Sequence, residues 1–199
     1  MRQTADAVSL ETMAPRQRIL MAARDLFYSR GIRGVSVEEI AAMARTNKMT
    51  LYRHFESKDL LIVEYLRGLA GEADTLWHEL ARTHPADPLA QLSGWVHRIG
   101  SAMADPVDRG CALANAAIEI PEKGHPARAV IEDHKNHQRE HIAALCGEAK
   151  FLEPERLADE IFLLLEGARV NMQSVGACGP GTRVSEMLCA LLKSRPRAT

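Results

Sequence analysis

The chain is poor in the residues that sheets require. Of its 199 residues only 5% are aromatic, and alternating valine and isoleucine are nearly absent. Strands favour aromatic and β-branched side chains in alternation, so their scarcity argues against a substantial sheet. Hydrophobic residues make up 46% and charged residues 26% of the chain, which is typical of a folded globular protein. We therefore predict an all-α fold.

Cysteine is sparse and widely spaced. The four cysteines, at positions 111, 146, 178 and 189, form no CxxC pair. This spacing indicates neither a zinc ribbon nor a disulfide framework. We expect these residues to be reduced thiols.

Long apolar runs and catalytic signatures are missing as well. No run approaches the roughly 18 apolar residues that cross a bilayer, and the N-terminus lacks the apolar core of a secretion signal. We therefore expect a cytoplasmic protein with no membrane partner. No GxSxG, HExxH or glycine-rich phosphate loop is present, so we expect neither enzymatic activity nor a cofactor.

Charge is divided unevenly along the chain. The formal net charge is −1, but residues 1–58 contain ten Lys and Arg against six Asp and Glu, a net of +4. The remaining residues therefore carry a net of −5. A basic end on an acidic body is the expected layout when one end of a protein meets phosphate.

The stretch Ser36–Phe55, SVEEIAAMARTNKMTLYRHF, predicts two short helices joined by a tight turn. Ser36 and Glu39 have the spacing of a capping box, in which each side chain satisfies a backbone N–H at the helix start. Thr46 or Asn47 can cap the second helix in the same way. The pattern predicts a helix-turn-helix.

The second of these helices, roughly residues 48–54, is the one that a helix-turn-helix inserts into the major groove. Its leading residues reach base edges, while neighbouring groups hold phosphates. Lys58 lies at the positive end of the following helix, a favoured phosphate site. The residues that we assign to DNA are Ser36, Thr46, Asn47, Lys48, Met49, Thr50, Tyr52, Arg53, His54 and Lys58.

Prolines and capping residues mark the helix boundaries in the rest of the chain. Pro15 opens the first helix and Gly31 ends it. Ser57 caps a long helix, and X-Pro steps open helices near 88–104, 126–148 and 154–175, with shorter helices near 111–120 and 183–193. This makes nine helices, which we divide into a flexible arm (1–14), a DNA-binding domain (15–56) and a helical body (57–195).

The segment from Arg16 to Leu61 closely resembles the N-terminal domain of TetR-family transcriptional regulators. The order of helix, glycine, Ser-x-x-Glu-Ile-Ala helix, turn, TLYRHF and SKDLL matches throughout. The resemblance implies the nine-helix fold of that family, with Tyr52 and Lys58 on phosphates and the start of the second helix facing bases. Met49 is a departure, because many relatives have glycine there.

The resemblance also implies a homodimer. In the family, the last two helices pack against their copies as a four-helix bundle, and here both are more apolar than one buried face requires. Two heads spaced in this way would read a near-palindromic operator in double-stranded DNA. The predicted interface residues are Leu157, Ile161, Leu164, Ala168, Met172, Val184, Met187, Leu188 and Leu191.

A ligand pocket in each body is the third implication of the resemblance. Its candidate lining residues are Trp95, Ile99, Met103, Cys111, Asn115, Ile118, His134, Phe162, Glu166 and Arg169. Most are apolar, so we expect a small, largely hydrophobic effector with one or two polar groups. An effector that prefers the conformation unable to bind DNA would release the operator, which predicts a ligand-responsive repressor.

Two rival sensing chemistries use the same scaffold. His134, His137 and His141 can share one helix face and could bind zinc, nickel or copper, although no cysteine lies nearby to complete the site and packing is the simpler role. Cys111 follows Arg109 near a helix start, where a thiol can become reactive towards oxidants or electrophiles. More remote alternatives are an enzyme and a DNA-organising protein without a ligand.

Overall fold

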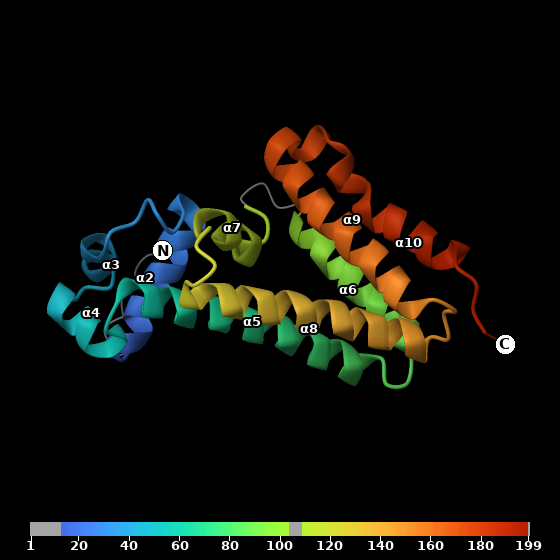
Figure 1. Ribbon diagram of the computed structural model, residues 1–199, viewed down its shortest axis with the longest axis horizontal. Helices are drawn as coiled ribbons and strands as arrows, with labels where there is room; N and C mark the ends of the chain where they lie inside the picture. Colours follow the sequence, from blue (N-terminus) through green and yellow to red (C-terminus); the bar gives the residue numbers. More distant parts are fainter. Residues whose placement is uncertain (1–12, 104–108, 199) are drawn as a thin grey trace, which may run out of the picture. The chain divides into compact units, whose positions relative to one another are not determined.

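The computed structural model describes residues 13–103 and 109–198. Over these ranges the chain forms nine α-helices and two short 3-10 helices, with a single isolated β-bridge between Phe151 and Arg197 (Figure 1). The all-α prediction is confirmed. All but two residues of the predicted arm (1–14) lie outside the described residues.

The helices begin and end close to the positions expected from the sequence. The first three are α2 (Pro15–Arg30), α3 (Val37–Met43) and α4 (Lys48–Phe55), followed by α5 (Lys58–Thr83), α6 (Pro88–Met103), α7 (Ala112–Glu119), α8 (Pro126–Glu148), α9 (Pro154–Val175) and α10 (Val184–Ser194). Four of them start at a proline, whose fixed φ and missing N–H suit a first helical position. The 3-10 helices η1 (Gly176–Cys178) and η2 (Pro180–Arg183) were not expected. Across the described ranges, no helix is long and apolar enough to cross a membrane.

Two compact units make up the chain. The head unit contains the residues up to 69 together with 112–131, and the body unit contains 70–111 with 132–199. Helices α5 and α8 contribute to both units, so the division differs from the predicted boundary at residue 56. Part of the reason is that α5 packs into the head, where Tyr65 lies against Phe27 with ring centroids 5.5 Å apart.

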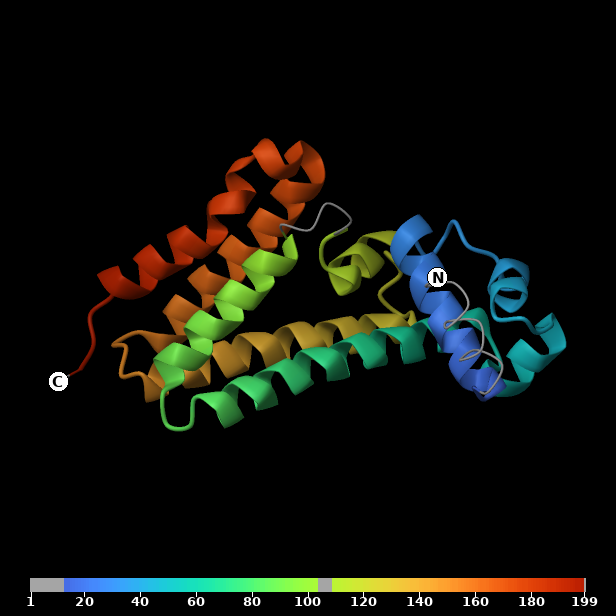
Figure 2. The ribbon, with the colours of Figure 1, turned by 180° about the vertical axis from the view of Figure 1, so that it is seen from behind.

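The head unit is built around fully buried aliphatic side chains. Ile19 of α2, Ile40 of α3 and Leu51 of α4 are each 0% exposed, and Leu66 of α5 joins them. Complete burial of one such side chain contributes about 1.5–3 kcal/mol. Both ribbon views show α2, α3 and α4 grouped together around this core (Figures 1 and 2).

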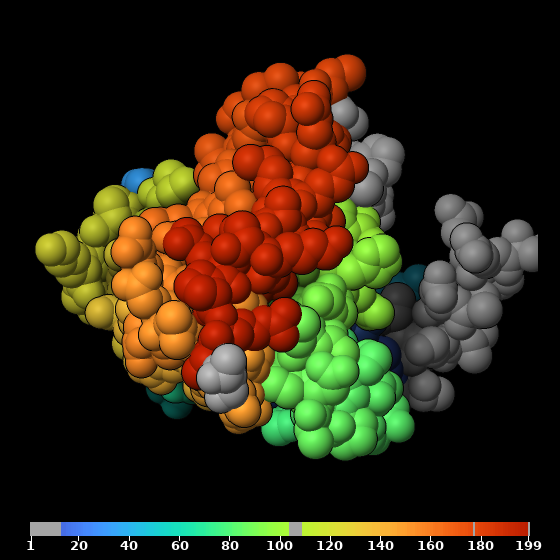
Figure 3. Space-filling model, turned by 90° about the vertical axis from the view of Figure 1, so that its right-hand side faces the viewer, coloured from blue at the N-terminus to red at the C-terminus, as the bar shows by residue number. Residues whose placement is uncertain are grey.

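The body unit has a core of its own, formed where α5, α6, α8, α9 and α10 meet. Trp77 and Trp95 stack with ring centroids 4.9 Å apart and are 5% and 2% exposed. Helix α10 packs on both α6 and α9, and Figure 3 shows it in red over these two helices.

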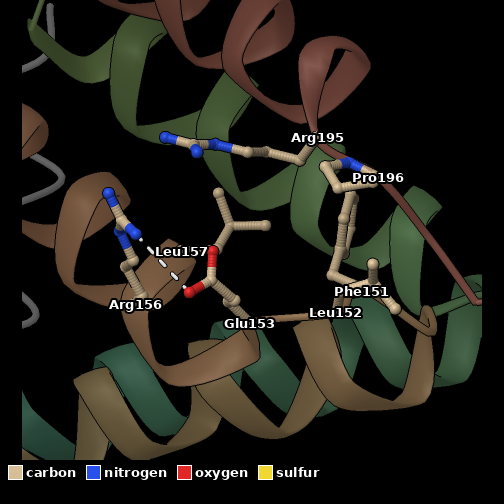
Figure 4. Close-up of a pocket in the computed structure, with 7 residues that line it drawn as sticks. All are labelled: Phe151, Leu152, Glu153, Arg156, Leu157, Arg195 and Pro196. Atoms are coloured by element: carbon tan, nitrogen blue, oxygen red, sulfur yellow. Dashed lines mark hydrogen bonds and ion pairs between the residues drawn. The ribbon is translucent and has the colours of Figure 1, made fainter.

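The C-terminal residues fold back on the loop between α8 and α9. The backbone N–H of Leu152 donates to the carbonyl of Pro196 at 3.2 Å, and that of Ala198 donates to Lys150 at 2.7 Å. Together with Glu153, Arg156 and their neighbours, these segments line a small pocket (Figure 4). Its volume of about 20 Å³ holds roughly one water molecule, so it is not an effector site.

Candidate DNA-binding interface

The start of α3 is held by the predicted capping box. Ser36 Oγ accepts a hydrogen bond from the Glu39 N–H at 3.2 Å, and Glu39 Oε2 accepts one from the Ser36 N–H at 2.8 Å. Arg30 Nη2 of α2 lies 2.7 Å from the other carboxylate oxygen of Glu39. These bonds lower the pKa of Glu39 to about 2, and the bond from the Ser36 N–H has the largest effect. The Ser36 hydroxyl is therefore engaged in structure as well as being exposed.

The turn between α3 and α4 depends on one left-handed residue and one cap. Arg45 has φ of 50°, an uncommon conformation for a residue other than glycine. The Thr46 N–H then donates to the Ala41 carbonyl at 2.9 Å. Of the two predicted caps, Asn47 is the one used, since its Oδ1 accepts from the Thr50 N–H at 2.9 Å.

Helix α4 has one buried side and one open side. Leu51 and Phe55 are 0% and 3% exposed and anchor the helix in the head core. Met49 is 75% exposed, which is high for an apolar side chain at the leading turn of the helix. Arg53 and His54 are also exposed, so α4 presents polar and cationic groups outward. This is the arrangement that a groove-reading helix requires.

Lys48, the first residue of α4, is not an isolated cation. Its Nζ lies 2.6 Å from Glu38 Oε1 of α3 and 5.8 Å from the centre of the Tyr52 ring. The hydrogen bond with Glu38 raises the pKa of Lys48 and lowers that of Glu38. Both side chains are more than half exposed, so the pair is accessible to competing phosphate.

Lys58 is placed differently from the prediction. Its Nζ turns inward and donates to the carbonyls of Ile32 at 2.7 Å and Val35 at 2.6 Å, and it lies 5.9 Å from the centre of the Phe27 ring. Burial lowers the pKa of this ammonium. Two of its three donors tie α5 to the loop before α3, and the phosphate contact assigned to Lys58 stays a prediction.

Two supporting residues in the head unit were missed by sequence reasoning. Arg18 Nε of α2 donates to the carbonyl of Ala44 at 3.1 Å and so holds the end of α3. Glu119 at the end of α7 accepts from the Arg33 N–H at 2.9 Å. No local pattern indicates either contact, because each joins segments that are distant in sequence.

The predicted ligand residues fall into different environments. In the body unit, Trp95 and Met103 are 2% and 4% exposed and belong to the core, with Ile99 packed against it. Asn115 and Ile118 belong to the head unit instead. Ile118 is 77% exposed, so its assignment to an enclosed lining is corrected.

Four other predicted ligand residues meet around a lysine that the prediction omitted. Lys135 Nζ lies 2.8 Å from Glu166 Oε2, 3.4 Å from Cys111 Sγ and 5.6 Å from the centre of the Phe162 ring. Arg169 Nη1 donates to Glu166 Oε1 at 2.8 Å. We call Lys135, Glu166 and Arg169 the charged triad.

The three histidines of α8 do not share one environment. His141 packs its ring 4.4 Å from that of Trp77, whereas His137 Nε2 lies 3.8 Å from Asp74 Oδ1. Burial is the main cause that lowers the pKa of both His134 and His141. In the described ranges, no three His, Cys, Asp or Glu side chains are grouped as a metal site would need.

The predicted dimer residues lie largely in the core of the body unit. Those buried within the single chain are Leu157, Ile161, Ala168, Val184 and Leu188, at 7% exposure or less, and Leu164, Met172 and Leu191 are half-buried. Only Met187 is well exposed, at 47%. The periodicity was correct, but the core of the body unit takes the face that we assigned to a partner.

A second apolar stripe lies on the open side of α9. Leu163 and Val170 are 68% and 58% exposed, and Gly167 lies between them in helical register. Residues spaced by three or four positions share one helix face. We call Leu163, Gly167 and Val170, together with the exposed Met187 of α10, the outer stripe.

Comparison with known sequences identifies relatives of the head. The family model "Bacterial regulatory proteins, tetR family" matches residues 19–65. An HTH-type transcriptional repressor of Mycobacterium tuberculosis is 41% identical over 69 residues, or 35% of each chain. The HTH-type transcriptional repressor KstR2 of Rhodococcus jostii is 28% identical over 122 residues, 61% of this chain and 50% of that one. The chain thus spans about a third to a half of the length of these curated relatives.

Comparison with solved structures extends the likeness to almost the whole chain. A TetR-family transcriptional regulator from Streptomyces coelicolor superposes with a TM-score of 0.79 at 27% identity. The match covers 90% of this chain and 92% of that one. A TetR transcriptional regulator from Chloroflexus aurantiacus has the same fold, with a TM-score of 0.79 at 21% identity.

Proposed function

Because residues 19–65 match the family model of tetR-family bacterial regulatory proteins and the chain has the fold of a solved TetR-family regulator, we propose that it is a ligand-responsive repressor that binds a near-palindromic operator as a homodimer. The observation that carries the proposal is that α4 exposes one side to solvent while Leu51 and Phe55 on its other side are buried. A helix fixed in this way can present a constant pattern of donors to base edges. The relatives that match the head include proteins named as transcriptional repressors, which supports repression.

The roles of the head residues follow from their placement. Met49 is well exposed and can contact a thymine methyl, and Thr50 can hydrogen-bond a base edge or a phosphate. Tyr52, Arg53 and His54 are assigned to the DNA backbone. Lys48 reaches a phosphate by exchanging its bond with Glu38.

The outer stripe supports the homodimer. Leu163 and Val170 would leave an apolar face of α9 in water if the chain were alone, and exposed apolar surfaces mark protein contacts. A methyl group added to Gly167 would meet no atom within 4 Å, so the helix surface is open there and a partner helix can approach closely. In a two-fold dimer the same stripe faces its own copy.

The effector acts through the body unit by shifting populations. A ligand that binds the conformation unable to reach two half-sites lowers the DNA-competent fraction. A tenfold loss of operator affinity needs a differential binding free energy of only about 1.4 kcal/mol. A small repacking of the body is therefore sufficient for release.

An electrophoretic mobility shift tests DNA binding directly. The full chain is incubated with DNA flanking its own coding region at low salt, and we expect a saturable shift that an unrelated fragment competes for only weakly. Arg53→Ala should weaken the shift, whereas Arg156→Ala, an exposed arginine of the body unit, should not. Absence of any shift, together with normal folding by circular dichroism, would contradict the proposal.

A thiol response is a second candidate for the signal. Cys111 Sγ lies 3.4 Å from Lys135 Nζ, and Cys111 is only half-buried. If this is the signal, N-ethylmaleimide should release DNA from the wild type but not from Cys111→Ser. Equal release from both would assign the effect to Cys178 or Cys189, which are exposed.

A further inference from the structure

The charged triad joins α8 to α9 at the edge of the body core. Lys135 and Arg169 each lie 2.8 Å from a different oxygen of Glu166. The exposed fractions of the three side chains are 16% for Lys135, 15% for Arg169 and 25% for Glu166. All three groups are thus largely withdrawn from water.

The triad contains more positive than negative charge. Burial raises the pKa of Glu166, but Lys135 and Arg169 outweigh this effect and hold the pKa below its ordinary value, so the carboxylate is ionised. One carboxylate then faces two cations. Among the other described acids, Asp74 interacts with the nearby His134, but its side chain is 47% exposed and lies beside His137. The described part of the body unit leaves about one positive charge uncompensated here.

The two cations also have donors to spare. Among the described residues, Arg169 makes one side-chain hydrogen bond, from Nη1 to Glu166, although its guanidinium carries five donors. Lys135 directs one donor to Glu166 and another to the weakly accepting Cys111 sulfur. Burying a cationic donor that has no strong acceptor costs free energy. A carboxylate would supply such an acceptor, because its two oxygens fit two parallel N–H donors of an arginine.

The surroundings of the triad are apolar. The Phe162 ring lies 5.6 Å from Lys135 Nζ and packs against the body core. His134, next to Lys135 in sequence, has a pKa lowered mainly by burial and adds little charge near neutral pH. A ligand here would meet the Phe162 ring beside the two cations.

We propose that the effector is an apolar molecule with one carboxylate, which Lys135 and Arg169 bind. This inference rests on the proposed function, because it names the chemical class of the effector. The single excess positive charge matches a monoanion rather than a phosphate dianion. Phe162 would contact the apolar part, and Glu166 positions both cations.

The competing explanation is a structural bridge between α8 and α9. One cation on Glu166 would be enough for such a bridge, and Arg169 is on the same helix as Glu166, so it adds nothing to the connection between helices. A purely structural triad predicts no preference for anions. Ligand charge therefore separates the two explanations.

The experiment compares decanoate with decanamide, which has the same chain without the charge, on the full protein. Calorimetric titration and thermal shift are measured for the wild type, Lys135→Met, Arg169→Met and Arg156→Met. Arg156 is the matched control, because it also lies on α9 and pairs with a glutamate three residues away, but it is 65% exposed. Arg169→Lys keeps the charge without the fork and serves if Arg169→Met fails to fold.

We expect decanoate to bind the wild type roughly tenfold or more tightly than decanamide, the size of effect that a buried charge-assisted hydrogen bond gives. Lys135→Met and Arg169→Met should each lose most of this preference, Arg169→Lys should retain part of it, and Arg156→Met should retain all of it. Equal binding of both probes would overturn the proposal. So would a preference that survives in Lys135→Met and Arg169→Met, or no decanoate binding at about 1 mM, a concentration that detects even weak complexes.

The result is independent of DNA binding. If the protein prefers decanoate through Lys135 and Arg169 but never shifts DNA, the carboxylate site stands and the proposed DNA-binding function is refuted. If the protein shifts DNA but binds decanoate and decanamide equally, the proposed DNA-binding function stands and the carboxylate site is refuted. The mobility shift is therefore run without any probe first.

Discussion

Glu38 of α3 holds the ammonium of Lys48, the first residue of α4, at 2.6 Å. The pair links the two helices of the helix-turn-helix across their exposed side. It also places a negative charge beside the leading edge of the helix that we assign to the major groove. In the proposed complex, operator phosphates would compete with this carboxylate for Lys48.

Removal of that competitor should strengthen DNA binding. Glu38→Gln keeps the shape of the side chain but releases Lys48, so we expect operator affinity to rise several-fold at low salt. The slope of log affinity against log salt should stay close to that of the wild type, because Lys48 makes the same phosphate contact in both proteins and only the competing carboxylate is lost. Fluorescence anisotropy over a salt series measures both quantities. Glu132→Gln, the same change of charge on exposed α8, should alter neither.

The inward placement of Lys58 predicts a loss of stability on substitution. Lys58→Met leaves the carbonyls of Ile32 and Val35 without their donor, which costs about 1–3 kcal/mol. Thermal unfolding should show a clear fall in Tm, while exposed Lys123→Met should unfold like the wild type. If Lys58→Met kept the wild-type Tm but bound the operator more weakly, Lys58 would instead have the phosphate role that the sequence predicts.

The outer stripe predicts which face of α9 holds a partner. Leu163→Glu places a charge on a side chain that is 68% exposed, so the single chain should fold but fail to dimerise. Light scattering after size exclusion should then give the mass of one chain, against two for the wild type. Ile118→Glu, a change at a 77% exposed site in the head unit, should leave the dimer intact. Dimers of Leu163→Glu would contradict this assignment.

The capping box predicts an acid-sensitive head. The pKa of Glu39 is lowered from 4.5 to about 2 in the folded chain, chiefly by the Ser36 N–H. A depressed folded pKa gives stability that is present above the unfolded value and lost as the pH falls through the folded one. The stabilisation should therefore be complete above about pH 4.5 and disappear towards pH 2.

Comparison with a variant isolates this effect. Glu39→Gln lacks the ionisation, so the difference in Tm between wild type and variant should shrink from about pH 5 to about pH 2. Glu122→Gln, an exposed loop residue, is the control. A difference that stays constant over this range would refute the assigned role of Glu39.

Local signals account for what could be predicted from the sequence. The Ser36–Glu39 box, the Asn47 cap and the prolines that open α2, α6, α8 and α9 each act within one helical turn, so neighbouring residues are enough to recognise them. For the same reason the helix-turn-helix is recognisable from one continuous stretch. The DNA contacts assigned to it stay predictions.

Contacts between distant segments account for what could not. The periodicity of α9 marks two apolar sides, and only the packing of α6 and α10 decides that Ile161 faces the core and Leu163 faces outward. Likewise, nothing near Lys58 indicates that its ammonium reaches the carbonyls before α3.

The sequence by itself determined the helices, their caps and the resemblance of the N-terminal segment to TetR-family regulators, because each depends on residues that lie close together in the chain. Only the tertiary structure decided which charged side chains pair with one another and which apolar helix face stays exposed to solvent. Lys135, absent from every local pattern, joins Glu166 and Arg169 only when α8 packs on α9. The physical reason is that burial and pairing depend on neighbours that the chain brings together by folding, not on neighbours in sequence.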